Sequence, residues 1–93
     1  MKTHNLKITL RYYYDIDFGK KTFEIRKNDR DYKVGDELVL DPYDDGYYMP
    51  KVSEEFVKRA GLLCKVTYIT DYAQQDNYVV LGFKLIGRVV YPF

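Results

Sequence analysis

The chain has 93 residues, and its 15 basic and 14 acidic side chains give a formal net charge of +1 at pH 7. This length suits one domain over residues 1–93 and excludes a multidomain enzyme. The small net charge excludes a protein that is basic over its whole surface, so attraction for an anionic partner must be local.

A helix is predicted over residues 10–18, between a short strand and a basic segment. Leu10, Tyr14 and Phe18 recur at i, i+4 and i+8, so we expect this apolar stripe to face the core. Gly19 follows it and is placed to end the helix in a left-handed conformation.

Runs in which apolar and polar residues alternate predict the strands. They cover residues 6–9, 21–27, 37–40, 62–70 and 78–86, and residues 88–93 extend the last strand or add an edge strand. Within the second run we expect Phe23 and Ile25 to be buried. Glu24 and Arg26 would then share an open surface with Thr22.

Turn residues separate these runs. We expect turns or loops at residues 28–31, 41–46 and 71–77, a tight bend at Gly35, and a bulge or close backbone approach at Gly82. A short helix is also expected over residues 53–60.

Five or six short strands with one or two short helices predict a mainly β (α+β) fold, arranged as a small, curved β-barrel. A parallel α/β fold is not expected, because the strands are too close in sequence for crossover helices.

The most basic segment is the strongest candidate for a binding site. Residues 20–33 contain six basic and three acidic side chains, a local net charge of +3. A carboxylate among cations can orient them, accept a base amino group or act as a general base, and the cations can contact phosphate. The alternative is a solvated strand face with ordinary ion pairs that contribute little to stability.

Several motifs resemble those of the ASCH domains of the PUA-like superfamily. The pattern Gly-x-Lys-x-x-Glu-x-Arg of one phage and bacterial subfamily matches Gly19, Lys21, Glu24 and Arg26. The other matching stretches are His4-x-Leu6-Lys7, residues 27–38, residues 66–69 and residues 78–82. The resemblance implies a PUA-like barrel whose cleft, beside the first helix, binds RNA or a modified nucleoside.

One branch of that superfamily deacetylates N4-acetylcytidine with a lysine and a threonine on this strand. The matching lysine is Lys21, but Glu24 stands at the threonine position, so the nucleophile is missing. Cleavage of RNA stays open as an alternative, with Lys21, Glu24 and Arg26 as acid, base and phosphate clamp.

Exposed tyrosines form a second candidate group. Tyr47 and Tyr48 could stack on a base, which contributes about 1–3 kcal/mol, or could simply pack their rings. Tyr13 and Tyr14 are expected to pack on the apolar stripe. The adjacent Asp44-Asp45 pair should repel a phosphate backbone and favour a free nucleoside over a long strand.

Neither a metal nor another cofactor is expected, since the chain has one histidine and one cysteine. His4 is structural or exposed unless it contacts the ligand, and Cys64 is expected to be a buried, inert thiol. The longest apolar run, residues 78–81, is far below the roughly 18 residues of a membrane span. The first residues lack a secretory signal, and we expect a soluble, cytoplasmic protein.

We therefore expect a module that binds RNA or a nucleotide-like ligand in a cleft between the first helix and the strand 21–27. The alternatives are a hydrolase acting on RNA or a nucleoside in the same cleft, and a phage-type accessory protein that binds a host protein. No catalytic residue is assigned. The expected ligand-binding residues are Lys20, Lys21, Glu24, Arg26, Arg30, Tyr47 and Tyr48.

Overall fold

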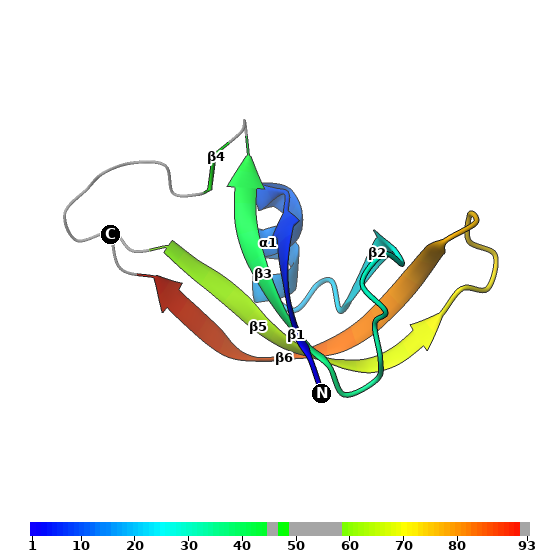
Figure 1. Cartoon of the computed structure of the whole chain (residues 1–93). Helices are drawn as coiled ribbons and strands as arrows, with labels where there is room; N and C mark the ends of the chain where they lie inside the picture. Colours follow the sequence, from blue (N-terminus) through cyan, green and yellow to red (C-terminus); the bar gives the residue numbers. More distant parts are fainter. Residues whose placement is uncertain (45–46, 49–58, 92–93) are drawn as a thin grey trace.

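The computed structural model describes residues 1–44, 47–48 and 59–91 (Figure 1). In chain order, the elements are β1 (Thr3–Ile8), α1 (Leu10–Asp17), β2 (Phe23–Lys27), β3 (Glu37–Asp44), β4 (Tyr47–Tyr48), β5 (Arg59–Thr70) and β6 (Tyr78–Tyr91). The expected small, mainly β fold is confirmed. No described helix combines the length and the apolar composition of a membrane span.

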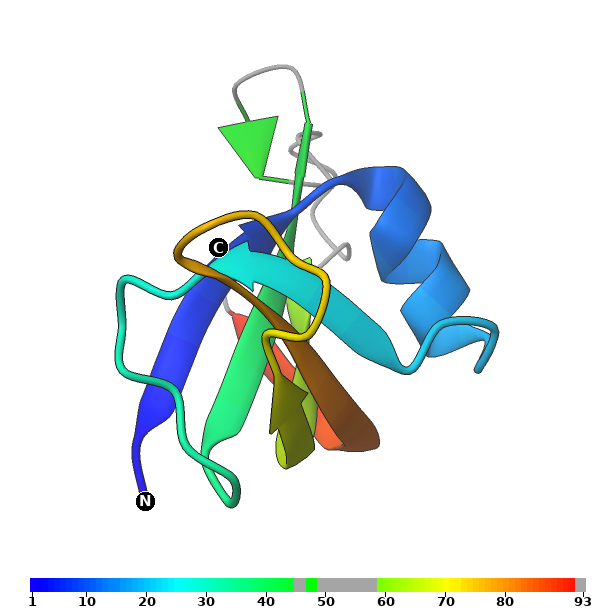
Figure 2. The ribbon, with the colours of Figure 1, turned by 90° about the vertical axis from the view of Figure 1, so that its right-hand side faces the viewer.

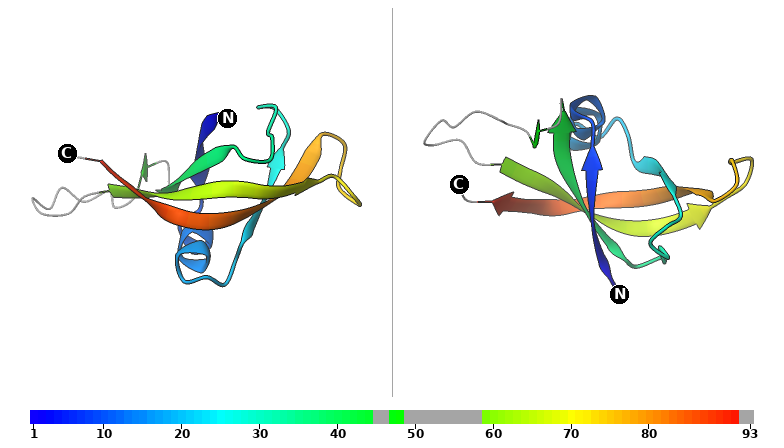
Figure 3. Two further views of the ribbon diagram at one scale, coloured as in Figure 1. Left: turned by 90° about the horizontal axis from the view of Figure 1, so that it is seen from below. Right: turned by 45° about the horizontal axis from the view of Figure 1, so that its top comes forward.

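Five strands form one curved sheet in the order β1-β3-β5-β6-β2, and β4 pairs with the end of β3. The β1–β3 pair is parallel, whereas the other ladders are antiparallel. Figure 3 shows β5 and β6 as a long, bowed hairpin that β1 and β3 cross. The described strands do not close into a barrel, because β1 and β2 are at the two ends of the strand order.

The β5–β6 hairpin is longer than the alternation predicts. Its ladder runs from Arg59 opposite Tyr91 to Thr70 opposite Val80, with register shifts at two places. One shift lies beside Gly82, where an added Cβ would be 3.3 Å from Tyr68 Cβ. The close approach expected at Gly82 is therefore confirmed. The shifts let the strands continue past the point where strict alternation ends.

Two other expected boundaries change. The loop expected over residues 41–46 is wrong in its first part, because β3 continues to Asp44. Asp41 and Pro42 are buried there, so packing extends the strand through a turn-like sequence. Of the helix expected over residues 53–60, residues 53–58 lie outside the described residues, and the last two belong to β5.

The core lies on the inner face of the sheet, beneath α1. Its fully buried side chains are Leu6, Ile16, Leu38, Leu40, Leu62, Cys64, Val66 and Leu81. Burial, and then the negative charge of Glu24, raises the pKa of the Cys64 thiol to about 12. The expected burial of this thiol is confirmed, and a raised pKa favours its unreactive, protonated form.

Helix α1 matches the expected span but turns a different face inward. Ile16 is buried and Tyr13 packs against the core, whereas Tyr14 and Phe18 are exposed and stack on each other. The expectation that Tyr14 faces the core is wrong. A helix of two turns can bury either the side that carries Tyr14 and Phe18 or the side that carries Tyr13 and Ile16. The second side faces the core here, and a hydrogen bond from the Tyr13 hydroxyl to the Ala60 carbonyl holds it there. Gly19 has the expected positive φ, +79°.

Candidate functional site

Strand β2 presents Glu24 and Arg26 to the interior, opposite to the expected orientation. Glu24 is buried and Arg26 is half-buried, whereas Phe23 and Ile25 are exposed. The cause is the register, because Glu24 pairs with Leu81, which belongs to the core face of β6. The expected sharing of one face by Glu24 and Arg26 is correct, but that face is the inner one.

An ion cluster compensates the buried carboxylate. Lys21 Nζ lies 3.0 Å from Glu24 Oε1, and Arg26 Nη1 lies 3.5 Å from Glu24 Oε2. The exposed fraction of the side chain is only 15% for Lys21, 26% for Arg26 and 5% for Glu24. Glu24 Oε1 has no partner with full hydrogen-bond geometry, so its contact with Lys21 is chiefly electrostatic.

Aromatic rings cover the lysine of this cluster. Lys21 Nζ lies 3.5 Å from the centroid of the Tyr12 ring of α1 and 5.2 Å from that of Phe23. Such cation–π contacts are strongest when the cation is desolvated. The Tyr12 ring of α1 and the Lys21 side chain therefore pack against each other between the first helix and the strand.

Two arginines join the free edges of β1 and β2. Arg26 Nη1 donates to the Lys7 carbonyl at 3.1 Å, and Arg30 Nη1 donates to the Asn5 carbonyl at 3.2 Å. The Lys2 carbonyl accepts from the β3 amide of Glu37, so odd-numbered carbonyls of β1 face the free edge. These guanidinium groups thus connect the two end strands of the sheet, β1 (blue) and β2 (cyan), which can be followed in Figure 2.

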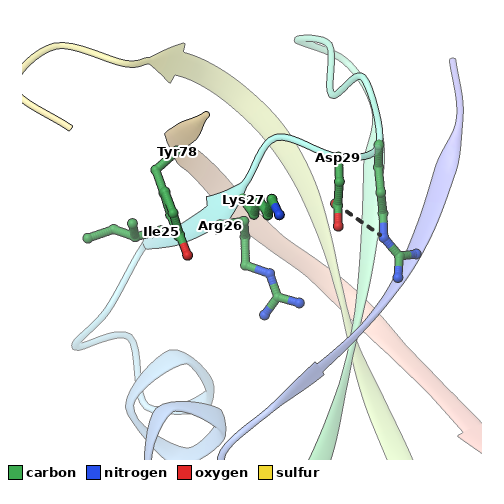
Figure 4. A pocket seen from close by; sticks show the side chains of 6 residues that line it. Ile25, Arg26, Lys27, Asp29 and Tyr78 are labelled. Atoms are coloured by element: carbon green, nitrogen blue, oxygen red, sulfur yellow. Dashed lines mark ion pairs between the residues drawn. The ribbon is translucent and has the colours of Figure 1, made fainter. Parts of the chain in front are cut away.

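A pocket of about 270 Å³ lies at the C-terminal end of the edge strand β2, and we call it the edge pocket. Its lining residues are Ile25, Arg26, Lys27, Asp29, Arg30 and Tyr78. Figure 4 shows the Tyr78 ring beside the β2 side chains. Three cations and one carboxylate give the lining a formal net charge of +2. Besides its hydrogen bond to the Asn5 carbonyl, Arg30 forms a long ion pair with Asp29, with 4.0 Å between Nε and Oδ1.

A buried histidine–aspartate pair supports the arginine-bearing turn. His4 Nε2 lies 2.8 Å from Asp36 Oδ2, and Asp36 also accepts from the backbone amides of Lys2 and Lys33. The hydrogen bond with His4, followed by that from Lys2, lowers the pKa of Asp36 to about 2. The His4 ring also packs against Tyr32, with 4.7 Å between centroids. The pair fixes β1 to the segment that follows Arg30.

Tyr32 connects this pair to the arginines. Burial raises the pKa of its hydroxyl, and the positive charges of Arg26 and Arg30 partly oppose that rise. The structural reading of His4 is therefore correct, since the ring is buried between β1 and the turn. Its partner Asp36 was missed by sequence reasoning, because an aspartate after Gly35 has the appearance of ordinary turn chemistry.

The expected site residues divide into four groups. Arg26 and Arg30 line the edge pocket, while Lys21 and Glu24 form the ion cluster behind Arg26. Lys20 is exposed and does not line the pocket. Tyr47 and Tyr48 form β4, and their side chains are outside the described part of the structure.

The lining residues that sequence reasoning missed are Ile25, Lys27, Asp29 and Tyr78. Lys27 and Tyr78 are cross-strand partners in the β2–β6 ladder. In the sequence, Lys27 ends one expected strand and Tyr78 begins another. Their closeness could be predicted only if the pairing of these two strands were known. Among the described residues, no group of three His, Cys, Asp or Glu side chains could hold a metal ion.

Comparison with known proteins gives two matches. The model of a family described as Domain of unknown function (DUF3850) matches residues 3–83, which include every lining residue of the edge pocket. The chain is also 28% identical over 89 residues to an uncharacterized 12.9 kDa protein in the GpA 3′ region of Escherichia phage P2. That alignment covers 96% of this chain and 73% of the phage protein.

Proposed function

We propose that the chain, which belongs to the family described as Domain of unknown function (DUF3850), binds RNA or another nucleotide-like ligand through the edge pocket. The observation that carries the proposal is the convergence of Arg26, Lys27 and Arg30 beside the Tyr78 ring in a pocket of about 270 Å³. The site lies at the C-terminal end of β2, whereas Lys21 and the Tyr12 ring pack together at the helix end of the strand.

Each part of the pocket has a role in this proposal. Arg26 and Arg30 can donate paired N–H groups to a phosphate, and Lys27 adds a mobile positive charge. The contacts of Arg26 with Glu24 and with the Lys7 carbonyl both use Nη1, so the guanidinium has further N–H groups to offer. Tyr78 and Ile25 provide an aromatic ring and an apolar surface for a base.

The ion cluster positions Arg26 rather than contacting the ligand. Glu24 holds the guanidinium from the interior, and Lys21 offsets the second carboxylate oxygen. This arrangement gives the motif that resembles that of the ASCH domains a role that needs no nucleophile. The proposal is of a cytoplasmic binding module that uses neither a metal nor another cofactor.

Titration with a nucleoside 5′-monophosphate and with a labelled single-stranded RNA tests the proposal. We expect Lys27→Ala and Arg30→Ala each to weaken binding about five- to tenfold, because each removes one charge-assisted contact. Arg11→Ala removes an exposed cation of α1 and should leave the affinity unchanged. The same samples are incubated with a mixed RNA pool and with N4-acetylcytidine.

Two outcomes would contradict the proposal. Equal affinity of the wild type and both pocket variants would place any binding elsewhere. Formation of a product that depends on Glu24, as measured with Glu24→Gln, would identify a hydrolase instead of a binding module.

A further inference from the structure

The outer face of the sheet next to the edge pocket carries exposed aromatic rings. In the β2–β6–β5 register, Phe23 lies opposite Gly82, and Gly82 lies opposite Tyr68. Phe23 is 41% and Tyr68 is 64% exposed. Because side chains alternate along a strand, these residues are on the face opposite to the buried Leu81. Across the three strands, the row therefore consists of the Phe23 ring, Gly82, which has no side chain, and the Tyr68 ring.

The spacing of this row suits a flat ligand. Adjacent strands are about 4.8 Å apart, so the backbones that carry Phe23 and Tyr68 are separated by about 10 Å. A planar ring placed above Gly82 would lie about 5 Å from each neighbour, which is within the usual range of aromatic contacts. Any side chain at position 82 would project between the two rings, since its Cβ would be 3.3 Å from Tyr68 Cβ.

Exposed lysines lie at both ends of the same face. Lys27 is at the edge pocket, while Lys65 and Lys84 are directly opposite each other on β5 and β6. Like charges at opposite positions of a ladder are unfavourable. Neither forms an ion pair within the described part of the chain, although Glu37 is the ladder neighbour of Lys65 on β3. An anionic partner would relieve this repulsion.

We propose that this stacking face, defined as Phe23, Ile25, Tyr68, Gly82 and the lysines 27, 65 and 84, binds single-stranded RNA that continues out of the edge pocket. The inference rests on the proposed function, and it names the ligand class more closely. Exposed rings stack on unpaired bases, and the lysines follow the backbone. From Tyr78 to Lys84 the face extends about 20 Å along β6, so it accommodates several nucleotides rather than one.

Fluorescence anisotropy with labelled RNA of two and eight nucleotides, and with an eight-base-pair duplex, tests this inference. The wild type should bind the eight-nucleotide single strand more tightly than the dinucleotide and more tightly than the duplex. Tyr68→Ala should weaken binding of the long strand about tenfold. It should leave binding of a nucleoside monophosphate unchanged. Tyr68→Phe keeps the ring and should restore the affinity.

The controls separate this inference from the proposed function. Tyr14→Ala removes an exposed ring of α1 and should behave as the wild type. Failure of the edge pocket would appear as mononucleotide binding that is insensitive to Lys27→Ala and Arg30→Ala. Failure of the stacking face would appear as unchanged long-strand binding by Tyr68→Ala, or as equal affinity for the duplex. A wild-type dimer that Tyr68→Ala makes monomeric, with long-strand affinity retained, would also overturn the inference.

Discussion

Asp36 has an environment that favours its ionised form. It accepts hydrogen bonds from the His4 ring and from the amides of Lys2 and Lys33, and its pKa falls from an ordinary 3.8 to about 2. A carboxyl whose pKa is lower in the folded than in the unfolded state stabilises the fold fully above its unfolded pKa. Its contribution is then lost as the pH falls from about 3.8 to about 2.

We therefore expect Asp36→Asn to have a lower free energy of unfolding than the wild type at pH 7. Between pH 4 and pH 2 the wild type should lose stability more steeply than the variant, because only the wild type has this carboxylate to protonate. Urea unfolding followed by circular dichroism over a pH series measures both curves. Parallel curves for the two proteins over this range would show that Asp36 does not have the described role.

Gly19 ends α1 with φ of +79°, and an added Cβ there would have nothing within 4 Å. A substitution at this position therefore tests backbone strain without a steric clash. Gly19→Ala should lower the free energy of unfolding by about 1 kcal/mol, because the left-handed conformation disfavours a Cβ. The free energy of unfolding is obtained from chemical denaturation.

Gly87 provides the matched control for that measurement. It lies in β6 without a positive φ, and the nearest atom to an added Cβ is 3.9 Å away. Gly87→Ala should change the stability by less than about 0.5 kcal/mol. If Gly87→Ala were as destabilising as Gly19→Ala, the loss would come from removing glycine in general and not from the helix end.

At the scale of whole elements, the sequence predicts which strands and which helix follow one another along the chain. It does not predict which face of each element points to the core. The alternation of β1 places Leu6 and Ile8 inward, and both are buried. The same rule fails in β2, because a carboxylate and two cations compensate one another inside. That compensation depends on the ladder that places Glu24 opposite Leu81, and the pairing is a long-range property.

The candidate site shows the same limit. Arg26 and Arg30 could be selected from the basic segment itself, because both lie within one short stretch of the chain. Tyr78 could not be joined to them, since about fifty residues separate it from β2 in sequence and only the β2–β6 ladder brings it there. Alternation along one strand gives no information about which strand becomes its neighbour.

The topology of the molecule concentrates positive charge where its sheet is open. The strand order leaves β1 and β2 at the two ends, and Arg26 and Arg30 bridge their edges through side-chain hydrogen bonds. A chain with a net charge of only +1 thus places a net charge of +2 in one pocket. The electrostatic response to an anionic ligand should therefore come from few residues.

The salt dependence of RNA binding measures how many side chains contact phosphates. With two or three phosphate contacts at the edge pocket, the affinity for a 5′-phosphorylated trinucleotide, which has three phosphates, should fall with a log–log slope of about −1.5 to −2. Lys27→Ala and Arg30→Ala should each make that slope shallower by about 0.7, the contribution of one phosphate contact on a single strand. Arg11→Ala should leave it unchanged.

For an eight-nucleotide strand that also reaches Lys65 and Lys84, the slope should steepen to about −3, because two further contacts are added. Anisotropy titrations at several salt concentrations give the slope for each length of strand. A slope that is already steep for the shortest strand, with losses spread over many lysines, would indicate a long basic groove. The cations that bind RNA would then be spread over the whole surface and not concentrated at the open edge of the sheet.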